Sequence, residues 1–478
     1  MTPSDDGHRL GAQALRDAAL LAALAATVRL VYLGLLDVPP YDPWRHLALV
    51  RSLRSGLGFT LFDGQPYLWY SPVWYVVCAV LPSWARMEWI AGAFSVLSVP
   101  ALYVVGRRMA GRVPAAVAAG LLAVCGPAVA FTCHYGPEAL ALFLTLTGVA
   151  AAAVGRGSVA ALAGGLAVGV AIVLRTNFAL DACLALPWIR GPRRAVAFLA
   201  GMAAPLAATF WRNQRILDTH PWVFTWDGLA TKSAGFDALS TLVVQMHPSV
   251  QGGLRRLHDL VVPYPEWLVH SGAANWPAIG FLGVGLVCVL LARRPALACA
   301  ALVPVAYFLW LDRSLSANFF RIYLPVLPPL FLAVGIVAAR LASRGRRLWL
   351  AGVVISIPVL GGAPLLVPQA IGALEDLTPP PEILSERAYL VPSGRFHPES
   401  LVWRFPERRF VGLPLDPADL AEFLAAYPEY RSVLLHDLTI QPEVERVLLA
   451  DPAWRLVRAA PNRAGHLYRV LVRTDPAR

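Results

Sequence analysis

The sequence predicts a polytopic α-helical membrane protein that carries a small α/β domain at its C-terminal end. Three observations support this prediction: the composition, a series of apolar runs separated by arginine-rich intervals, and a change of pattern after residue 368. Of the 478 residues, 57% are hydrophobic and 15% are charged, and the mean hydropathy is +0.56. Soluble domains have about 45–50% apolar and about 25% charged residues. The apolar excess therefore requires several membrane spans.

Apolar runs of about membrane-spanning length recur along the first 368 residues. A transmembrane helix needs about 20 predominantly apolar residues. The candidate runs are 17–36, 67–82, 89–105, 113–132, 137–154, 158–174, 176–189, 194–211, 276–292, 295–311, 322–339 and 348–368.

The polar intervals between these runs predict the topology. Five short intervals hold arginines and no acidic residue: Arg107, Arg108 and Arg112; Arg156; Arg190, Arg193 and Arg194; Arg293 and Arg294; and Arg340, Arg344, Arg346 and Arg347. Short arginine-rich loops stay in the cytoplasm. They alternate with mixed or acidic intervals near 133–138, 175, 212–275 and 312–321, which we expect on the outer face.

If cytoplasmic and outer intervals alternate in this way, the run 67–82 does not cross the membrane. The first span follows Arg9 and Arg16, so it should run from the inside to the outside. The aromatic run 67–82 then fits a helix that lies in the outer interface or re-enters from it, and an ordinary span is the alternative. We expect about eleven crossings, a cytoplasmic N-terminus, and a membrane domain 1–368 with outer loops 37–88 and 212–275 in a cytoplasmic (inner) membrane.

Residues 369–478 have a different pattern, in which short apolar runs, among them Ser432–Leu435 and His466–Val472, alternate with helical ones. This spacing predicts a soluble α/β domain on the extracytoplasmic side. The segment holds 13 Arg and 15 acidic residues, so the net charge of +11 arises in the membrane part. No basic stripe on a soluble surface is visible, so nucleic acid is not expected as a partner. The six cysteines lie in or beside apolar stretches without the spacing of a zinc site.

The first outer loop holds the strongest candidate for catalysis. Asp42 follows the first span closely and precedes Pro43. A carboxylate at the membrane surface can act on a group presented by a lipid. Alternatively, Asp42 caps a helix that begins at Pro43, because Asp at the N-cap and Pro at the first helical position are both favourable. A capping aspartate is also rigidly placed, so the two interpretations are compatible.

Several short motifs follow one another in a defined order. An arginine late in span one (Arg29) precedes Asp42, a Gly-x-Gly-Phe at 56–59 and a Pro-flanked aromatic stretch from Tyr70 to Tyr75. Downstream come His134-Tyr-Gly-Pro-Glu138, Trp211-Arg212-Asn213 and Arg321-Ile-Tyr323-Leu-Pro-Val-Leu-Pro328. Over about residues 15–340, this set resembles the glycosyltransferase C superfamily, in particular the bacterial branch similar to protein O-mannosyltransferases and lipid A aminoarabinose transferases.

The resemblance implies a hexosyl- or pentosyltransferase that moves a sugar from a polyprenyl-phosphate donor to an acceptor outside the membrane, with inversion. Asp42 would be the general base, and Arg212 and Arg321 would bind the donor phosphate. Arginines at helix ends also reach lipid headgroups, which is the alternative for Arg212, Arg321, Arg175 and Arg313. Secondary candidates are Glu138, Asp63, His46, Asn213, Tyr323 and Tyr70.

The first loop departs from the family in one respect. The family usually has two acidic residues there, but Pro43 follows Asp42, and Asp63 is the only nearby second acid. No cofactor is therefore predicted, and a divalent metal is left open without being indicated. The expected partners are a polyprenyl-phosphate-linked sugar, the lipid bilayer, and an acceptor glycan, lipid or protein.

Two other functions remain as alternatives. A polymerase or ligase of surface polysaccharide would also use outer arginines and lipid-linked substrates, but it needs no acid directly after the first span. A transporter would show internal repeats and ionisable residues near the midplane. Apart from Asp181, the apolar runs after the first span lack acidic residues in their interior, and no half of the chain repeats the other.

Overall fold

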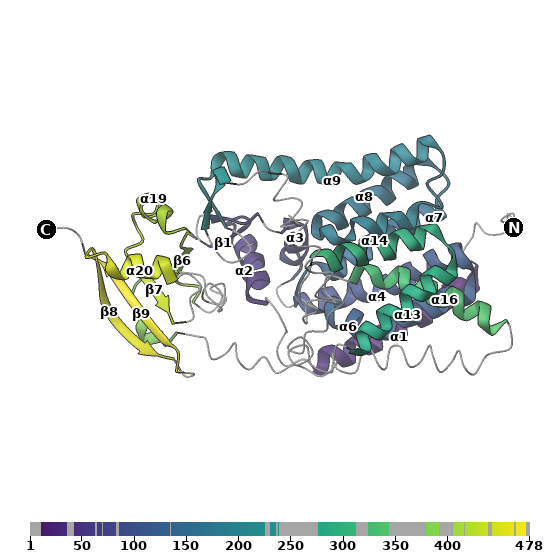
Figure 1. Cartoon of the computed structure of the whole chain (residues 1–478), viewed down its shortest axis with the longest axis horizontal. Helices are drawn as coiled ribbons and strands as arrows, with labels where there is room; N and C mark the ends of the chain where they lie inside the picture. The colour runs from purple at the N-terminus through teal and green to yellow at the C-terminus, as the bar shows by residue number, and fades with distance from the viewer. Residues whose placement is uncertain are drawn as a thin grey trace. The chain divides into compact units, whose positions relative to one another are not determined.

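The computed structural model describes residues 11–35, 43–62, 65–68, 70–82, 86–133, 135–224, 230–235, 238, 276–311, 324–343, 379–391, 401, 405–414, 416–437, 442–462 and 465–474. The chain forms two compact units (Figure 1). Unit 1 comprises Met1–Asp37, Ala85–Thr209 and Gln245–Pro368, and unit 2 comprises Val38–Trp84, Phe210–Val244 and Gln369–Arg478. Unit 2 thus contains much of the two predicted outer loops as well as residues 369–478. The predicted domain boundary at 368/369 instead divides the chain at one point of the sequence.

Unit 1 is built from helices that run side by side (Figure 1). They are α1 (Ala12–Leu35), α4 (Met87–Ala110), α5 (Arg112–Val124), α6 (Gly126–Thr132), α7 (Glu138–Val154), α8 (Ser158–Leu174), the 3₁₀ helix η2 (Thr176–Ala185), α9 (Pro192–Thr219, up to Thr209), α13 (Trp276–Ala292), α14 (Pro295–Leu311), η5 (Leu324–Val326) and α16 (Leu327–Ala342).

Four helical segments in the described part of the chain are long and apolar enough to cross a membrane. They are Ala12–Gly34, Met87–Ala110, Pro192–Thr219 and Leu324–Ala342. Shorter apolar helices accompany them, among them Glu138–Val154 and Ser158–Leu174. The prediction of a mostly helical chain with several candidate membrane spans is confirmed, and the count of about eleven crossings stays a prediction.

Small residues let these helices approach closely. A Cβ atom at Gly165 of α8 would collide with the backbone carbonyl of Phe198 in α9. At Gly148 of α7, a Cβ atom would lie 2.5 Å from the carbonyl oxygen of Gly164 in α8. Such contacts drive helix association where no hydrophobic effect operates between helices, so Gly165 and Gly148 fix how α7, α8 and α9 pack.

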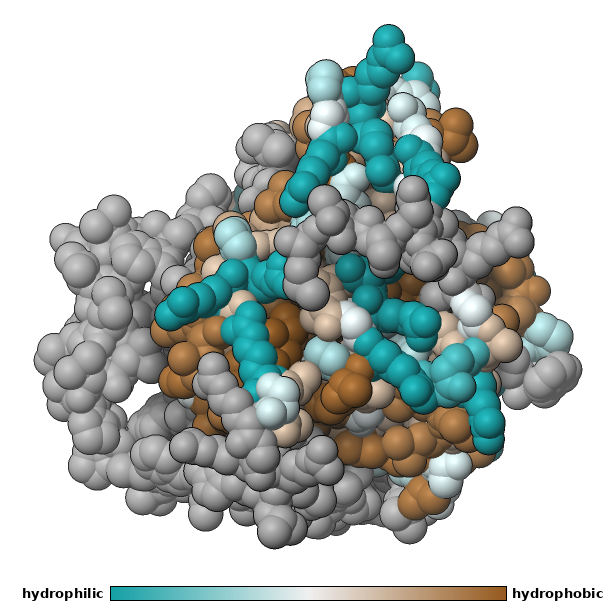
Figure 2. Space-filling model, turned by 90° about the vertical axis from the view of Figure 1, so that its right-hand side faces the viewer, coloured by the Kyte–Doolittle hydropathy of each residue, from teal (hydrophilic) through white to brown (hydrophobic). Residues whose placement is uncertain are grey.

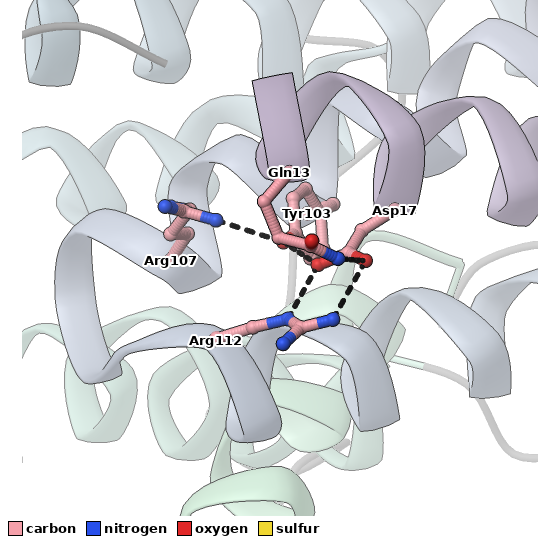
Figure 3. Close-up of polar contacts among 5 residues, drawn as sticks. All are labelled: Gln13, Asp17, Tyr103, Arg107 and Arg112. Carbon is pink, nitrogen blue, oxygen red and sulfur yellow. Dashed lines mark hydrogen bonds and ion pairs between the residues drawn. The ribbon is translucent and has the colours of Figure 1, made fainter. Parts of the chain in front are cut away.

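Asp17 joins three helix ends of unit 1 (Figure 3). Its carboxylate accepts two hydrogen bonds from Arg112, at the beginning of α5, across 2.7 and 3.0 Å. It also accepts a hydrogen bond from the Tyr103 hydroxyl, late in α4, at 2.8 Å and one from Gln13 at 3.0 Å. Arg107 donates to the Tyr103 hydroxyl at 3.2 Å. The beginnings of α1 and α5 and the end of α4 therefore lie together.

The end of α16 reaches the same end of unit 1. A Cβ atom at Gly335 would collide with the backbone of Pro114, near the beginning of α5. Arg340, in the last turn of α16, donates hydrogen bonds to the carbonyl oxygens of Leu291 and Ala292 at 2.7 and 3.2 Å. These two carbonyls belong to the end of α13, so the connection to α14 lies there too.

The ends of α7 and α4 also share this side. α4 and α7 pack along each other, and Phe94 and Phe143, which lie near the beginnings of these helices, have ring centroids 5.4 Å apart, so the two helices run in the same direction. Arg194, at the beginning of α9, donates to the carbonyl oxygens of Ala152 and Gly155 at 2.7 and 2.9 Å. The described arginines of the five basic intervals thus gather at one end of unit 1, and Figure 2 shows hydrophilic side chains clustered on one face among hydrophobic ones.

Unit 2 begins with the helix α2 (Pro43–Arg54), the β1–β2 hairpin (Thr60–Phe62 and Gln65–Pro66) and the helix α3 (Pro72–Val80). The last turns of α9 lead into a second hairpin, β3–β4 (Trp222–Phe224 and Ala230–Lys232), which is followed by η3 (Ser233–Gly235). A nine-residue helix such as α3 rises about 13 Å, and the hydrocarbon core is about 30 Å thick. α3 is therefore too short to cross the membrane alone.

The rest of unit 2 is a five-stranded mixed sheet with strand order β6-β5-β7-β9-β8. Its elements are η8 (Pro381–Ile383), β5 (Ala388–Val391), β6 (Arg409–Gly412), η9 (Pro417–Asp419), α19 (Leu420–Ala426), β7 (Ser432–His436), α20 (Pro442–Ala450), β8 (Trp454–Pro461) and β9 (Leu467–Arg473). β5 pairs in parallel with β6 and β7, and β9 runs antiparallel to β7 and β8. Trp222 of β3 lies in the hydrophobic core of this sheet, against Phe423.

Candidate functional site

Four of the predicted site residues lie outside the described residues: Asp42, Asp63, Arg321 and Tyr323. Their roles stay predictions. The other predicted residues are described. Arg212, Asn213, His46 and Tyr70 belong to unit 2, and Glu138 belongs to unit 1.

Arg212 is held by the first predicted outer loop. It lies near the end of α9, where its Nη2 donates a hydrogen bond to the carbonyl oxygen of Tyr67 at 3.3 Å. Its Nη1 donates to Oδ1 of Asn213 at 3.0 Å, and its guanidinium carbon lies 5.4 Å from the centroid of the Phe59 ring. Two segments far apart in the sequence, the stretch 59–67 and the end of α9, are thus brought together.

The guanidinium of Arg212 has N–H donors that the described hydrogen bonds do not use. A guanidinium has about five N–H donors, and hydrogen bonds within the described part of the chain use two of them, one to Tyr67 and one to Asn213. The Arg212 side chain is half-buried, and Asn213 is buried. An arginine with a fixed plane and spare donors is suited to bind a phosphate group in bidentate fashion.

The Gly-x-Gly-Phe motif shapes this contact. Gly56 and Gly58 have φ angles of +73° and +79°, a left-handed conformation that glycine adopts without steric cost. The Ser52 hydroxyl donates to the carbonyl oxygen of Gly58 at 3.0 Å and fixes the turn. The chain therefore reverses after α2, and Phe59 can reach the Arg212 guanidinium.

The aromatic residues of the first loop pack against one another. His46 Nδ1 lies 2.7 Å from the Tyr75 hydroxyl, and its ring lies 5.5 Å from that of Tyr70 between centroids. Phe59 and Tyr67 meet edge to face at 5.7 Å. Four of these residues are buried, namely His46, Tyr67, Tyr70 and Tyr75. They therefore pack in the interior of the loop and offer little surface for a sugar or a prenyl chain.

In unit 1, Glu138 forms an ion pair with Arg175. Glu138 is the first residue of α7 and is buried, and Arg175 follows α8. Sequence reasoning offered Arg175 as a phosphate ligand or a headgroup anchor, and it treated Glu138 as a separate acid. The structure instead pairs the two charges, which links the beginning of α7 to the end of α8.

The interaction of Glu88 with Tyr135 was not anticipated from the sequence. The carboxylate of Glu88, at the beginning of α4, lies 3.7 Å from Arg86. Burial, and after it the Glu88 carboxylate, raise the pKa of Tyr135. Tyr135 stands within the His134-Tyr-Gly-Pro-Glu138 motif, so its place in the sequence was the available signal.

Arg29 binds three helices of unit 1 together. It is buried, and its Nε donates to the Ser95 hydroxyl of α4 at 2.8 Å. Its two terminal nitrogens donate to the carbonyl oxygens of Ala123 and Leu122, near the end of α5, the latter at 3.1 Å. The arginine of the first family motif therefore holds α1 against α4 and α5.

No group of three or more His, Cys, Asp or Glu side chains within the described ranges is arranged to hold a metal ion. Asp42 and Asp63 lie outside those ranges.

Comparisons with known proteins identify the fold. No family model and no curated protein matches the sequence. Among solved structures, the apo oligosaccharyltransferase of Archaeoglobus fulgidus superimposes with a TM-score of 0.51 at 14% identity, over 88% of this chain and 69% of that one. ArnT from Cupriavidus metallidurans, bound to undecaprenyl phosphate, superimposes with a TM-score of 0.51 at 14% identity, over 95% of this chain and 97% of that one. The chain therefore shares the fold of these two proteins, as the resemblance of its motifs led us to expect.

Proposed function

We propose that this protein is a membrane glycosyltransferase that transfers a sugar from a polyprenyl-phosphate donor to an acceptor at the outer face of the cytoplasmic membrane, with inversion. The observation that carries the proposal is the Arg212 guanidinium, held by Tyr67 and Asn213 with spare donors. The fold is shared with ArnT from Cupriavidus metallidurans, whose structure contains undecaprenyl phosphate.

The leaving group of this reaction is a phosphate monoester. It departs as an anion and needs stabilisation of its charge more than a proton. Arg212 supplies a planar fork of donors for phosphate oxygens, and Arg321 is proposed as the second phosphate ligand. The half-buried position of Arg212 strengthens such a contact, because the effective dielectric constant is lower there than in water.

The acceptor hydroxyl needs a general base close to the anomeric carbon. Asp42 takes this role in the proposal. It precedes α2, which begins at Pro43, and α2 is held to α3 by a hydrogen bond from Arg54 to the carbonyl oxygen of Cys78 at 2.9 Å. The packed aromatic support under His46 and Tyr70 gives the loop a rigid base.

The proposed topology places the N-terminus in the cytoplasm and residues 369–478 outside. The described arginines of the basic intervals gather at one end of unit 1, which supports a cytoplasmic position for that end. Glu88, Glu138 and Arg175 belong to the opposite helix ends, which are then the outer ones.

Mass spectrometry of the cell envelope tests the proposal. A strain that lacks the protein is expected to lose one glycosyl modification of an envelope glycan, lipid or protein, and to accumulate the polyprenyl-phosphate-linked form of the same sugar. Complementation with the wild-type chain should restore both signals. An unchanged envelope together with unchanged lipid-linked sugars would refute the proposal.

A further inference from the structure

Gln65 makes a long-range contact with the edge of the five-stranded sheet. Its side-chain Nε2 donates to the carbonyl oxygen of Gly412 at 3.3 Å, and its Oε1 accepts from the Gly412 backbone N–H at 3.2 Å. Gly412 ends β6, the edge strand of the sheet. Edge strands expose unpaired backbone donors and acceptors. The amide of Gln65, which is fully buried, satisfies one such pair as another strand would.

The hairpin that carries Gln65 also carries the contacts of Arg212. β2 continues directly into Tyr67, whose carbonyl oxygen accepts from Arg212, and β1 directly follows Phe59, whose ring lies beneath the guanidinium. The Tyr67 N–H donates to the Phe59 carbonyl oxygen at 3.0 Å and closes the hairpin at this end. The hairpin therefore joins Gly412 at one side to the guanidinium at the other.

The helix that carries Arg212 is attached to the same sheet. α9 leads into β3, where Trp222 is buried in the core of the sheet and meets the Phe423 ring edge to face at 5.0 Å. The last turns of α9 also pack on the first loop, because Leu217 shares a buried cluster with Leu68 and Val223. Arg212 and its partner Tyr67 are thus both attached to the five-stranded sheet. Gln65 is the polar contact that attaches the hairpin preceding Tyr67.

We infer that Gln65 is a positioning residue for the donor phosphate. Its amide fixes the β1–β2 hairpin to β6, and the hairpin orients the Arg212 guanidinium through Tyr67 and Phe59. This inference rests on the proposed function, because it assumes that Arg212 binds the phosphate. Gln65 itself touches no substrate in this scheme and acts only through Arg212.

The test measures binding of undecaprenyl phosphate to the full-length protein in nanodiscs of neutral lipid. Gln65→Met keeps the size of the side chain and removes both hydrogen bonds. Because Gln65 acts only through Arg212, we expect a part of the Arg212 effect, that is, an affinity about two- to tenfold weaker than that of the wild type. Arg212→Gln is expected to weaken binding at least about tenfold. The double variant should bind no more weakly than Arg212→Gln alone, because Gln65 has no separate route to the phosphate.

Gln65→Glu provides a second variant with its own readout. At neutral pH and above, the carboxylate cannot donate to the Gly412 carbonyl oxygen, so binding should weaken. A protonated carboxyl group has one donor and one acceptor, as the amide has. The affinity of this variant should therefore recover as the pH falls, relative to the wild type at the same pH, and an affinity that stays weak at every pH would contradict the role of these hydrogen bonds.

Arg458→Gln is the matched control. It removes a hydrogen bond of 2.9 Å to the carbonyl oxygen of Glu382 in the same unit, but Arg458 lies on β8, at the sheet edge opposite β6, and makes no described contact with either hairpin. It should leave the affinity unchanged. Wild-type affinity in Gln65→Met beside weak binding in Arg212→Gln would overturn the inference and leave the proposed function standing, as would losses that add in the double variant. Wild-type affinity in Arg212→Gln would overturn both.

Discussion

The Arg212 guanidinium donates a hydrogen bond from Nη2 to the carbonyl oxygen of Tyr67, across 3.3 Å and 145 positions of sequence. A backbone carbonyl is a fixed partner, so the plane of the guanidinium is set by the main chain of the first loop. The Phe59 ring beneath it limits movement out of that plane. The Arg212 guanidinium would therefore be partly ordered before the donor binds, which lowers the entropic cost of association.

Replacement of Arg212 tests its role in donor binding. Arg212→Gln should raise the KM for the polyprenyl-phosphate sugar at least about tenfold, because a charge-assisted contact is lost. Arg212→Lys should rescue only part of this loss, since an ammonium group cannot present two parallel donors. Steady-state kinetics at varied donor concentration measure both effects.

Arg215→Gln is the control for that experiment. Arg215 lies on the same helix, is exposed, and stacks over Trp211 at 4.7 Å. It should leave the KM for the donor unchanged. Equal effects of the Arg212 and Arg215 variants would mean that Arg212 serves only as an anchor to lipid headgroups.

The buried ion pair of unit 1 predicts a stability cycle. Glu138→Gln leaves the Arg175 guanidinium without its counter-charge and should lower the free energy of unfolding by about 1–3 kcal/mol. Glu138→Gln combined with Arg175→Gln should cost less than the sum of the two single changes, because no uncompensated charge remains. Thermal unfolding in detergent of the four proteins measures the coupling, and strictly additive losses would show that the pair contributes nothing.

Lys232 offers a chemical probe, because it is the only lysine in the chain. Its Nζ lies 2.8 Å from Oδ1 of Asp419 and 2.8 Å from Oε2 of Glu422. These two carboxylates raise the pKa of the Lys232 ammonium, Asp419 more than Glu422. An amine-reactive ester should therefore label Lys232 more slowly than it labels free lysine at mildly alkaline pH, because only the neutral amine reacts.

Removal of the carboxylates should reverse this protection. Asp419→Asn should speed the labelling of Lys232, and Asp419→Asn with Glu422→Gln should speed it further. Peptide mass spectrometry separates Lys232 from the N-terminal amine. Labelling as fast as that of free lysine in the wild type would contradict the ion pairs.

His436 predicts the pH dependence of stability in unit 2. Burial, and to a smaller extent the nearby His466, lower the pKa of His436 from 6.5 to about 4, and Asp437 offsets only part of this effect. Between these values the unfolded chain binds a proton at this site that the folded chain does not. Stability should therefore fall as the pH drops from about 6.5 to about 4, with no further change from this group below that range.

Thermal unfolding of the full chain at neutral pH and at about pH 5 measures this effect. The decrease in Tm should be smaller in His436→Gln than in the wild type. His220→Gln is the control, because His220 is exposed and belongs to the same unit. An identical decrease in the wild type and His436→Gln would show that His436 is not the titrating group.

Local patterns predicted many of the elements. The runs 137–154 and 158–174 correspond to α7 and α8 within one residue, because a change from apolar to polar residues marks each end. Pro43 begins α2, as expected for a proline at the first helical position. In the last part of the chain, Ser432–Leu435 and His466–Val472 correspond closely to β7 and β9.

Other elements carried no local signal. The apolar run 113–132 is divided into α5 and α6 at Cys125, before Pro127, and the run 176–189 is largely a 3₁₀ helix. α9 continues through Pro205 to Thr219, beyond the end of its apolar run. β8 is exposed over most of its length, so its sequence does not alternate as a half-buried strand would.

The candidate site shows the same limit. The sequence singled out Arg212 and Asn213 by their place in the ordered set of motifs, but it could not pair Arg212 with Tyr67. The contact of Gln65 with Gly412 spans 347 positions and depends on the edge of a sheet that forms much later in the chain. The pairing of Glu138 with Arg175 also depends on how α7 and α8 pack, which the periodicity of either helix does not specify.

The most direct test of the central claim is sugar transfer by the purified full-length protein, with polyprenyl-phosphate sugars and envelope acceptors extracted from its own cells. The account predicts that the wild type releases polyprenyl phosphate as it glycosylates the acceptor. Asp42→Asn, which caps a helix about as well as Asp, should fold normally and transfer about 10²–10⁴ times more slowly. Transfer by Asp42→Asn at the wild-type rate would show that Asp42 is only a helix cap, and a wild-type protein that consumes no polyprenyl-phosphate sugar would contradict the account as a whole.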